Sequence, residues 1–362
     1  MTDHASSAAG LRVAIVGVGR FGALHARVWS EAGAVLAGLC DVNAARLTEV
    51  AARFGVPEVD LDVDVGRLIR RVHPDAVVIA SDEDIHAPLA LAALAAGCDV
   101  FVEKPLALSA TDAWRVRDAS VAADRQVIVG QISRFASPYV RMRDSVRRGR
   151  IGTVCALRLR RDFSRAWFRG FGSRVHPVWE SCIHDIDLAI AFVGRPVARV
   201  IALSSTAAGD AQQSVVVALL EFVGGSIGTI ESAWLVPDTA PQTMSGALEL
   251  AGSIVGEVEI LGLDGILRQR LVADSLVEWT AQGVAVPDLS LWPEERGQIQ
   301  GALRREVEYA IEVITRRRAP EVVPLDEACW GVEAAEAVVQ SLRTRAPVEI
   351  TRRGAADAAP AS

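Results

Sequence analysis

The stretch LRVAIVGVGRFG, residues 11–22, decides the fold of this chain. An apolar, β-branched run ends at Gly17 and leads directly into a helical pattern. Gly17 permits a tight turn, Gly19 lets the backbone approach a ligand, and Gly22 allows the helix to pack closely on the strand. Free N–H groups at the start of such a helix attract an anion such as a pyrophosphate. The pattern predicts a strand–turn–helix unit that binds a dinucleotide, and the alternative is a tight turn without a ligand. The expected contacts are Gly17, Gly19, Arg20, Phe21 and Gly22.

Strand and helix patterns alternate outward from this stretch through the first third of the chain. Strands separated by helices of ordinary length indicate βαβ units and a parallel sheet. We therefore expect a doubly wound α/β domain over residues 11–132. Its further strands are expected at residues 34–42, 75–81, 98–105 and 125–131, and its helices at 20–32, 47–55, 88–97 and 111–124, the last capped by Thr111.

The pattern changes after about residue 133, where the strands become longer and alternate apolar with polar residues. Such alternation predicts a mostly antiparallel sheet with one open face. We expect an α+β domain over residues 133–350, whose last two helices pack back on the first domain, and a disordered tail over residues 353–362. The expected strands are 153–163, 198–207, 214–224, 226–236, 246–255 and 256–263, and the expected helices 138–149, 178–194, 298–317 and 325–344.

Composition excludes several classes of protein. The 362 residues contain 38 Lys and Arg against 45 Asp and Glu, and a net charge of −7 disfavours nucleic-acid binding. No apolar run approaches the roughly 18 residues that span a bilayer, and the first ten residues lack the features of a signal peptide. The five scattered cysteines show no metal-binding spacing. We expect a cytoplasmic protein with reduced thiols, no metal site and no membrane partner.

Lysine occurs only once, at Lys104, so the other 37 of the 38 basic side chains are arginine. Lys104 lies in the tripeptide Glu103-Lys104-Pro105 at the carboxyl end of an expected parallel strand, where open α/β sheets bind ligands. An ammonium group can donate to a substrate oxygen and can lose its proton when desolvated, which arginine cannot do. A surface lysine is the alternative, although an arginine-rich background disfavours it.

Two further patterns carry chemistry. Asp41 ends the second expected strand, where a carboxylate accepts from a ribose 2′-hydroxyl and repels a 2′-phosphate, so NAD is favoured over NADP. Spacings of four and three place Glu180, His184 and Asp187 on one face of a helix. Carboxylates beside a histidine can fix its tautomer and raise its basicity, as a general base requires. A solvated polar face is the alternative reading, and a metal site would be incomplete with one His.

Together, GVGRFG, SDEDIH, EKP and WESCIHDIDL resemble the Gfo/Idh/MocA family of glucose–fructose oxidoreductase, inositol dehydrogenase and rhizopine-catabolism proteins, over about residues 11–350. The resemblance implies a Rossmann domain followed by an open mixed sheet that forms homodimers or homotetramers. It also implies NAD(P)-dependent hydride transfer at a carbinol carbon of a sugar or polyol.

The resemblance extends to individual residues. Lys104 matches the lysine of the EKP motif and His184 the catalytic histidine. Glu180 stands where the family often has Asp, and Asp187 matches a common acidic position after the histidine. The cofactor contacts implied are Ser81, His86, Glu103, Lys104 and Pro105, and Arg134 matches a position where arginine is common.

A long loop between the first antiparallel strand and the His184 helix is a candidate for substrate binding, because long loops in compact domains are often functional. Aromatic rings stack on sugar faces, and arginine binds phosphate or carboxylate groups. The weaker candidates there are Arg160, Asp162, Trp167, His176 and Trp179. His25 has no evident partner and is interpreted as a core or surface residue.

These observations predict an NAD(P)-dependent oxidoreductase that acts on a secondary alcohol or ketone of a sugar, polyol or cyclitol. Lys104 and His184 are the expected catalytic residues, with Glu180 or Asp187 orienting His184. One alternative is a reductase of a keto-sugar nucleotide or aminocyclitol precursor in natural-product biosynthesis. A second is a non-catalytic relative that senses dinucleotides.

Overall fold

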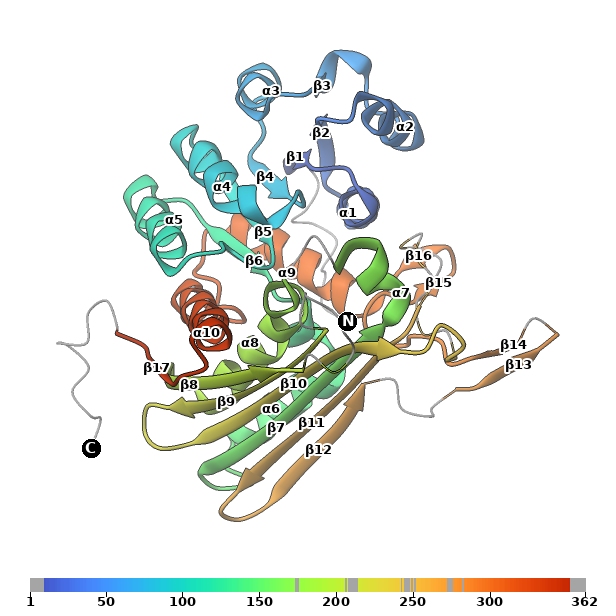
Figure 1. Ribbon diagram of the computed structural model, residues 1–362. Helices are drawn as coiled ribbons and strands as arrows, with labels where there is room; N and C mark the ends of the chain where they lie inside the picture. The colour runs from blue at the N-terminus through green and yellow to red at the C-terminus, as the bar shows by residue number, and fades with distance from the viewer. Residues whose placement is uncertain are drawn as a thin grey trace.

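The computed structural model describes residues 10–172, 176–205, 207, 214–241, 243, 248, 250, 252–271, 276–281 and 283–351. The expected tail over residues 353–362 lies outside the described residues, as does most of the first half of the expected strand over 246–255. Figure 1 shows two sheets, with helices on both sides of the upper one and the lower one open on one side.

The first sheet is parallel, and its six strands lie in the order β3-β2-β1-β4-β5-β6. This is the Rossmann order, which reverses between β1 and β4 and opens a crevice at the carboxyl ends of those strands. The strands are β1 (Arg12–Val16), β2 (Val35–Cys40), β3 (Leu61–Asp62), β4 (Ala76–Ile79), β5 (Asp99–Glu103) and β6 (Val127–Gly130). The helices are α1 (Arg20–Glu31), α2 (Ala44–Phe54), α3 (Val65–Val72), α4 (His86–Ala95) and α5 (Ala110–Ala123), with 3₁₀ turns η1 (Glu58–Asp60) and η2 (Glu83–Ile85).

The start of α5 differs from the expectation. Its N-cap is Ser109, whose side chain accepts a hydrogen bond from the backbone N–H of Asp112 at 3.1 Å. Thr111 therefore lies inside the helix, because Ser109 is the residue in extended conformation just before it.

The second sheet has seven strands in the order β12-β11-β7-β10-β9-β8-β17. Strands β7 and β10 are parallel and the other neighbours antiparallel, so the sheet is mixed but mostly antiparallel. The carboxyl ends of β7 and β10 and the start of β11 consequently meet at one edge. The strands are β7 (Val154–Ser164), β8 (Val197–Ser204), β9 (Val215–Phe222), β10 (Ile227–Val236), β11 (Ile254–Gly262), β12 (Ile266–Leu271) and β17 (Val348–Glu349).

Helices cover one face of this sheet and join it to the first (Figure 1). Helix α10 packs against both β8 and α5, and the indole Nε1 of Trp114 on α5 donates to Glu333 on α10 at 2.7 Å. The helices and turns are η3 (Ile132–Phe135), α6 (Ser137–Arg147), α7 (Arg165–Trp167), the π-helical turns η4 (Phe168–Gly172) and η5 (Val178–Cys182), α8 (Ile183–Val193), α9 (Gly301–Arg316) and α10 (Leu325–Thr344). None of the described helices is long and apolar enough to cross a bilayer.

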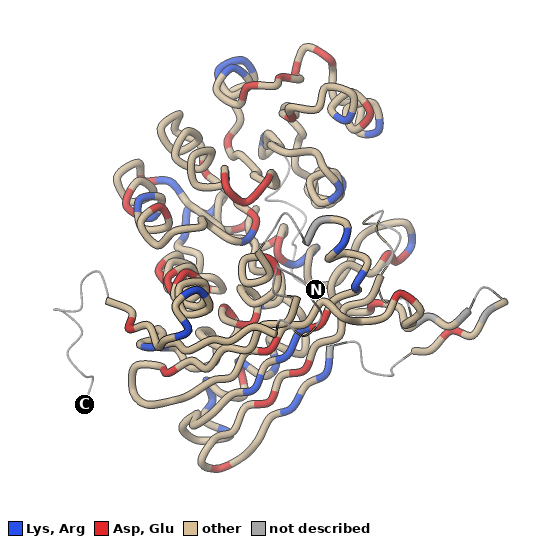
Figure 2. Tube along the Cα trace, viewed as in Figure 1, with Lys and Arg blue, Asp and Glu red and all other residues tan. Residues whose placement is uncertain are grey.

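The other face of the second sheet is exposed, and Figure 2 shows basic and acidic positions interspersed along its strands. Exposed apolar side chains accompany them at Ile201, Leu203, Val217 and Leu219. Two short hairpins that the sequence did not indicate follow β12: β13 (Glu278–Thr280) with β14 (Gly283–Ala285), and β15 (Glu294–Glu295) with β16 (Gln298–Ile299).

Candidate active site

A cavity of about 750 Å³ lies between the carboxyl ends of the first sheet and the edge of the second. Its lining runs from Asp41 at the end of β2, past the glycine turn and Lys104, to His184 on α8. The Rossmann crevice and the second sheet therefore share one continuous site.

The glycine turn fits a pyrophosphate. A Cβ at Gly17 would lie 2.7 Å from the backbone of Ala80 and Ser81, and one at Gly22 would lie 1.8 Å from the carbonyl oxygen of Gly17. Packing within the protein therefore requires both glycines. A Cβ at Gly19 would meet no atom within 4 Å, so this glycine leaves open space in front of the backbone. That space adjoins the start of α1, which has no side-chain cap and offers free N–H groups to an anion.

Asp41 lines the cavity directly after β2, and Arg20 and Phe21 line it at the start of α1. Its carboxylate accepts hydrogen bonds from the backbone N–H groups of Val18 at 2.7 Å and Asn43 at 2.8 Å. These bonds hold the carboxylate in a fixed position, and the free lone pairs of its oxygens can accept from a ribose hydroxyl.

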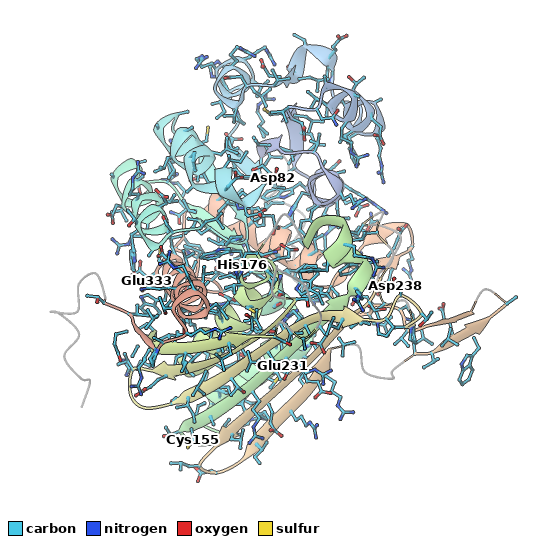
Figure 3. All side chains as sticks on the ribbon, in the orientation of Figure 1. Asp82, Cys155, His176, Glu231, Asp238 and Glu333 are labelled. Atoms are coloured by element: carbon cyan, nitrogen blue, oxygen red, sulfur yellow. The ribbon has the colours of Figure 1, made fainter. Side chains whose placement is uncertain are left out.

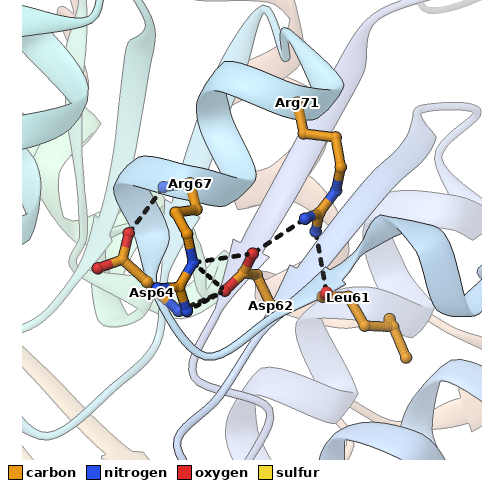
Figure 4. A network of polar contacts seen from close by, with 5 residues as sticks. All are labelled: Leu61, Asp62, Asp64, Arg67 and Arg71. Atoms are coloured by element: carbon orange, nitrogen blue, oxygen red, sulfur yellow. Dashed lines mark hydrogen bonds and ion pairs between the residues drawn. The ribbon is translucent and has the colours of Figure 1, made fainter.

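An ion-pair network beside Asp41 holds the loop after β3 (Figure 4). Asp62 accepts from Arg67 and from Arg71, each at 2.9 Å, and Arg71 also donates to the carbonyl of Leu61. Hydrogen bonding to Arg67 holds the pKa of Asp62 well below its usual range. Asp64 caps α3 through the N–H of Arg67 and lines the cavity. Sequence patterns did not indicate β3 or α3, so this wall was missed.

Ser81, His86 and Pro105 lie together where the loops after β4 and β5 meet. The buried His86 ring places Nδ1 2.7 Å from the carbonyl oxygen of Pro105 and Nε2 3.1 Å from that of Ser81. His86 therefore ties the two loops together, and both Ser81 and His86 border the cavity. Neighbouring Asp82 also lines it, at the position labelled in Figure 3.

Glu103 fixes the backbone that carries Lys104. Its Oε1 lies 2.7 Å from Nε2 of His25, and its Oε2 accepts from the backbone N–H of Lys104 at 3.2 Å. His25 on α1 is completely buried. The expectation that His25 has no partner is wrong, because a βαβ fold places α1 beside the end of β5, a proximity that residue spacing does not reveal.

Lys104 and Glu180 form an ion pair at the centre of the cavity. The Lys104 Nζ donates to Glu180 Oε2 at 2.7 Å and to the backbone carbonyl of Glu180 at 3.1 Å. Their side chains are 13% and 30% exposed, so the pair is partly shielded from water. The π-helical turn η5, which precedes α8, presents the carbonyl and the carboxylate of the same residue to the ammonium group. One ammonium proton remains for a third acceptor.

His184 lines the cavity one helical turn after Glu180. Burial, followed by the positive charges of Lys104 and Arg161, lowers the pKa of His184 well below its usual range. The imidazole is consequently neutral at physiological pH and has a lone pair for a proton. Its Nδ1 is buried and has no hydrogen-bond partner among the described residues.

Asp187 does not orient His184. Both of its oxygens accept from Arg134, Oδ2 from Nε and Oδ1 from Nη2, each at 2.7 Å. Arg134 also pairs with Glu327 and donates to the carbonyl of Val322 at 3.0 Å. The buried Arg134 thus joins η3, α8 and the start of α10, and neither it nor Asp187 lines the cavity. Each residue satisfies the other's charge in the core, so the structure leaves Glu180, and not Asp187, as the carboxylate near His184 in the cavity, and Arg134 has a structural position.

Among the weaker substrate candidates, Trp167 lines the cavity. Arg160 lies on the exposed face of the second sheet, beside Glu231 (Figure 3), and its partner Asp162 does not line the cavity either. The half-buried His176, which accepts from the N–H of Val178 at 3.2 Å, also stands outside the lining. The buried Trp179 does so as well.

The arginine that β7 contributes to the cavity is Arg161, not Arg160. Arg161 follows Arg160 on β7, points to the opposite face and lines the cavity, where it is buried and donates to Asp185 at 2.8 Å. Successive side chains of a strand alternate between faces, so the apolar positions Leu157 and Leu159 already assigned the odd-numbered residues to the inner face. That alternation could have identified Arg161 and Phe163.

Comparisons with known proteins agree with this geometry. Residues 11–131 match the GFO/IDH/MocA model of an oxidoreductase family with an NAD-binding Rossmann fold, and residues 139–267 match the GFO/IDH/MocA C-terminal domain. Myo-inositol 2-dehydrogenase of Thermotoga maritima is 30% identical over 232 residues, which cover 62% of this chain and 68% of that one. Inositol 2-dehydrogenase of Rubrobacter xylanophilus is 28% identical over 94% of this chain and 93% of its own.

Solved structures share the fold over nearly the whole chain. Myo-inositol 2-dehydrogenase from Lactobacillus plantarum superposes with a TM-score of 0.78 at 22% identity, covering 94% of this chain and 100% of that one. Scyllo-inositol dehydrogenase from Lactobacillus casei, solved with NAD(H) and scyllo-inositol, gives 0.77 at 20% identity over 94% and 99%.

Proposed function

Because this chain belongs to the Gfo/Idh/MocA family of NAD-binding oxidoreductases, we propose that it transfers hydride between NAD and a secondary alcohol or ketone. Sugars, polyols and cyclitols all contain such groups. The observation that carries the proposal is the meeting of Lys104 and His184 in one cavity with the glycine turn. Asp41, Gly19 and Lys104 line the same cavity and would hold the dinucleotide, which would supply the hydride acceptor or donor.

Lys104 binds the reacting oxygen in this proposal. Two of its three protons are held by Glu180, so the third has a fixed direction and donates to the alcohol or ketone oxygen. As the oxygen becomes more negative along the reaction, the ammonium stabilises the developing charge. Glu180 is the positioning residue for that donor.

His184 holds the proton. In alcohol oxidation, the neutral imidazole accepts the hydroxyl proton, and in ketone reduction the imidazolium returns it to the oxygen. The bound nicotinamide supplies the hydride acceptor or donor. The glycine turn and Asp41 would hold the rest of the dinucleotide, and the Asp41 carboxylate favours NAD over NADP.

The alternatives have less support. A keto-sugar nucleotide carries phosphates, whereas Arg161, the cation that the second sheet contributes to the described lining, is already neutralised by Asp185. A dinucleotide sensor would have no need of an ammonium group held by two acceptors beside a neutral imidazole.

We also propose that the exposed face of the second sheet forms a homo-oligomer. Ile201, Leu203, Val217 and Leu219 lie exposed there, and contact with a second copy would bury them. Sedimentation equilibrium would give a dimer or tetramer, and a monomer at all concentrations would contradict this assembly.

The proposed activity is tested with purified protein, NAD or NADH, and a panel of secondary alcohols and ketones, followed by absorbance at 340 nm. We expect turnover with at least one compound and its loss in His184→Gln, while NADH binding, measured by fluorescence, persists. NADH binding without turnover of any alcohol or ketone in the panel would contradict the proposal.

A further inference from the structure

One wall of the cavity differs chemically from the rest. It is built at the edge where β7, β10 and β11 meet, together with α7 and the segment before β11. We call it the apolar wall, and its described members are Phe163, Trp167, Trp234, Leu248, Leu250 and Ile254.

Strand register places these side chains together. Phe163 on β7 is paired with Ile254 on β11, and its ring stacks on Trp234 of β10 with a centroid distance of 4.9 Å. The ring of Trp167 lies 5.8 Å from that of Phe163. The aromatic part of the wall is therefore packed and preformed.

The Trp234 indole is hydrogen-bonded within the protein, and the Trp167 indole packs against the backbone. Trp234 Nε1 donates to the buried Ser181 Oγ at 3.3 Å. The indole of Trp167 lies against Gly252, where a Cβ would come within 2.4 Å of the ring and 2.5 Å of its Nε1. Only glycine leaves room for the ring there, so the chain seats Trp167 with its indole nitrogen against the backbone.

The polar lining groups near the reacting position are Lys104, Glu180 and His184, together with Arg161 on β7, whose charge Asp185 balances. The described part of the apolar wall presents carbon to a ligand. A hydroxyl pressed against it would lose its water without gaining a partner, a loss of roughly tenfold in binding or more for each hydroxyl.

We propose that the substrate is an amphipathic secondary alcohol or ketone. Its reacting C–O group faces Lys104 and His184. The side away from that group is an alicyclic or aromatic hydrocarbon surface with few hydroxyls, and it faces the apolar wall. This inference rests on the proposed hydride transfer and narrows its substrate. A ring hydroxylated at every carbon fits the polar side of the cavity but not the wall.

A graded series of cyclohexane alcohols tests the inference on the wild-type protein. With saturating NAD, we would measure kcat/KM for scyllo-inositol, trans-cyclohexane-1,2-diol and cyclohexanol, and for 1-phenylethanol as an aromatic member. We expect kcat/KM to rise at least tenfold from the inositol to the best of the less hydroxylated compounds. An inositol that is the best substrate of the series would overturn the inference and leave the proposed hydride transfer standing.

A variant of the wall gives a second, independent result. Leu250→Gln places an amide on the half-buried part of the wall, and Leu263→Gln, at the exposed turn after β11, is the matched control. We expect Leu250→Gln to shift the kcat/KM ratio of inositol to cyclohexanol about tenfold toward the inositol, and Leu263→Gln to leave it unchanged. Equal ratios in all three proteins would contradict the proposed role of the wall. If the wider panel contains a substrate but no member of the series reacts, this inference is overturned and the proposed function stands. If NADH binds but neither the series nor the panel is turned over, the proposed function fails and this inference falls with it.

Discussion

Replacing Lys104 with arginine keeps the positive charge but removes the geometry that the site uses. The Nζ atom donates to the carbonyl and the carboxylate of Glu180 at 3.1 and 2.7 Å, which directs its third proton toward the cavity. A guanidinium is larger, and its donors lie in one plane, so it cannot keep both bonds and aim a further donor in the same direction. The substitution therefore preserves the ion pair and loses the donor to the reacting oxygen.

The size of the effect follows from this geometry. Loss of one donor to a developing oxyanion costs about 2.7–4 kcal/mol, or a factor of roughly 10² to 10³ in kcat. We expect Lys104→Arg to fall in this range, with KM and NADH affinity changed much less, because Lys104 acts at the reacting oxygen. Lys104→Met, similar in length but uncharged, is expected to lose more, since Glu180 is then left without its partner.

The assay is steady-state kinetics at 340 nm with the best substrate of the panel, alongside NADH titration by fluorescence and thermal unfolding of each variant. A Lys104→Arg protein that folds and binds NADH but keeps a kcat within threefold of the wild type would refute the argument. In that case the site would need only a positive charge at this position.

Three further results are expected. Glu180→Asp withdraws the carboxylate from Lys104 by roughly 1.5 Å. The attraction between the two charges then falls from about 6 to about 4 kcal/mol at an effective dielectric constant of 20, so kcat should drop about tenfold. An unchanged kcat would show that Glu180 does not position Lys104. Asp41→Ser removes the carboxylate that repels a 2′-phosphate, so the kcat/KM ratio of NADP to NAD should rise at least tenfold; a constant ratio would assign the preference elsewhere. Glu306 on α9 is fully buried and has no hydrogen-bond partner in the part of the chain that the structure describes. Burial, followed by the charges of Glu103 and Asp187, raises the pKa of Glu306 well above its usual range. The folded protein therefore keeps a proton on Glu306 that the unfolded chain releases above about pH 4.5. As the pH rises from about 4.5 to the pKa of Glu306 in the folded protein, the free energy of unfolding falls by up to about 1.4 kcal/mol per pH unit. Urea unfolding from pH 5 to 8 should show this fall in the wild type and a flatter profile in Glu306→Gln, whereas identical profiles would mean that Glu306 is ionised in the folded protein.

Local patterns were sufficient for much of the fold. The glycine turn and the strand–helix alternation predicted the parallel sheet, and the helix expected at residues 325–344 has those bounds in the structure. Strand β3 and helix α3 were not predicted, because the strand is only two residues long and the helix is short and rich in arginine. The parallel pairing of β7 with β10 was also missed, since alternation along a strand does not reveal the direction of its neighbour.

The candidate site shows where residue spacing stops being informative. Lys104 stands out in the sequence as the only lysine, directly after a buried strand, and the structure places it in the cavity with His184. Helical spacing also placed Asp187 beside His184, yet a single helix face can point partly into a cavity and partly into the core, where Asp187 meets Arg134. The partner of Lys104 proved to be Glu180, a contact made across 76 residues that depends on how the two sheets pack.

The presence of a single lysine allows the central claim, that Lys104 donates to the reacting oxygen, to be tested directly. Protein labelled with ¹³C at lysine Cε gives one side-chain resonance, from Lys104. With NAD(H) bound, addition of a substrate or ketone that the enzyme turns over should shift this resonance, because the third ammonium proton exchanges water for the reacting oxygen. A resonance that stays in place at saturating substrate would contradict the claim.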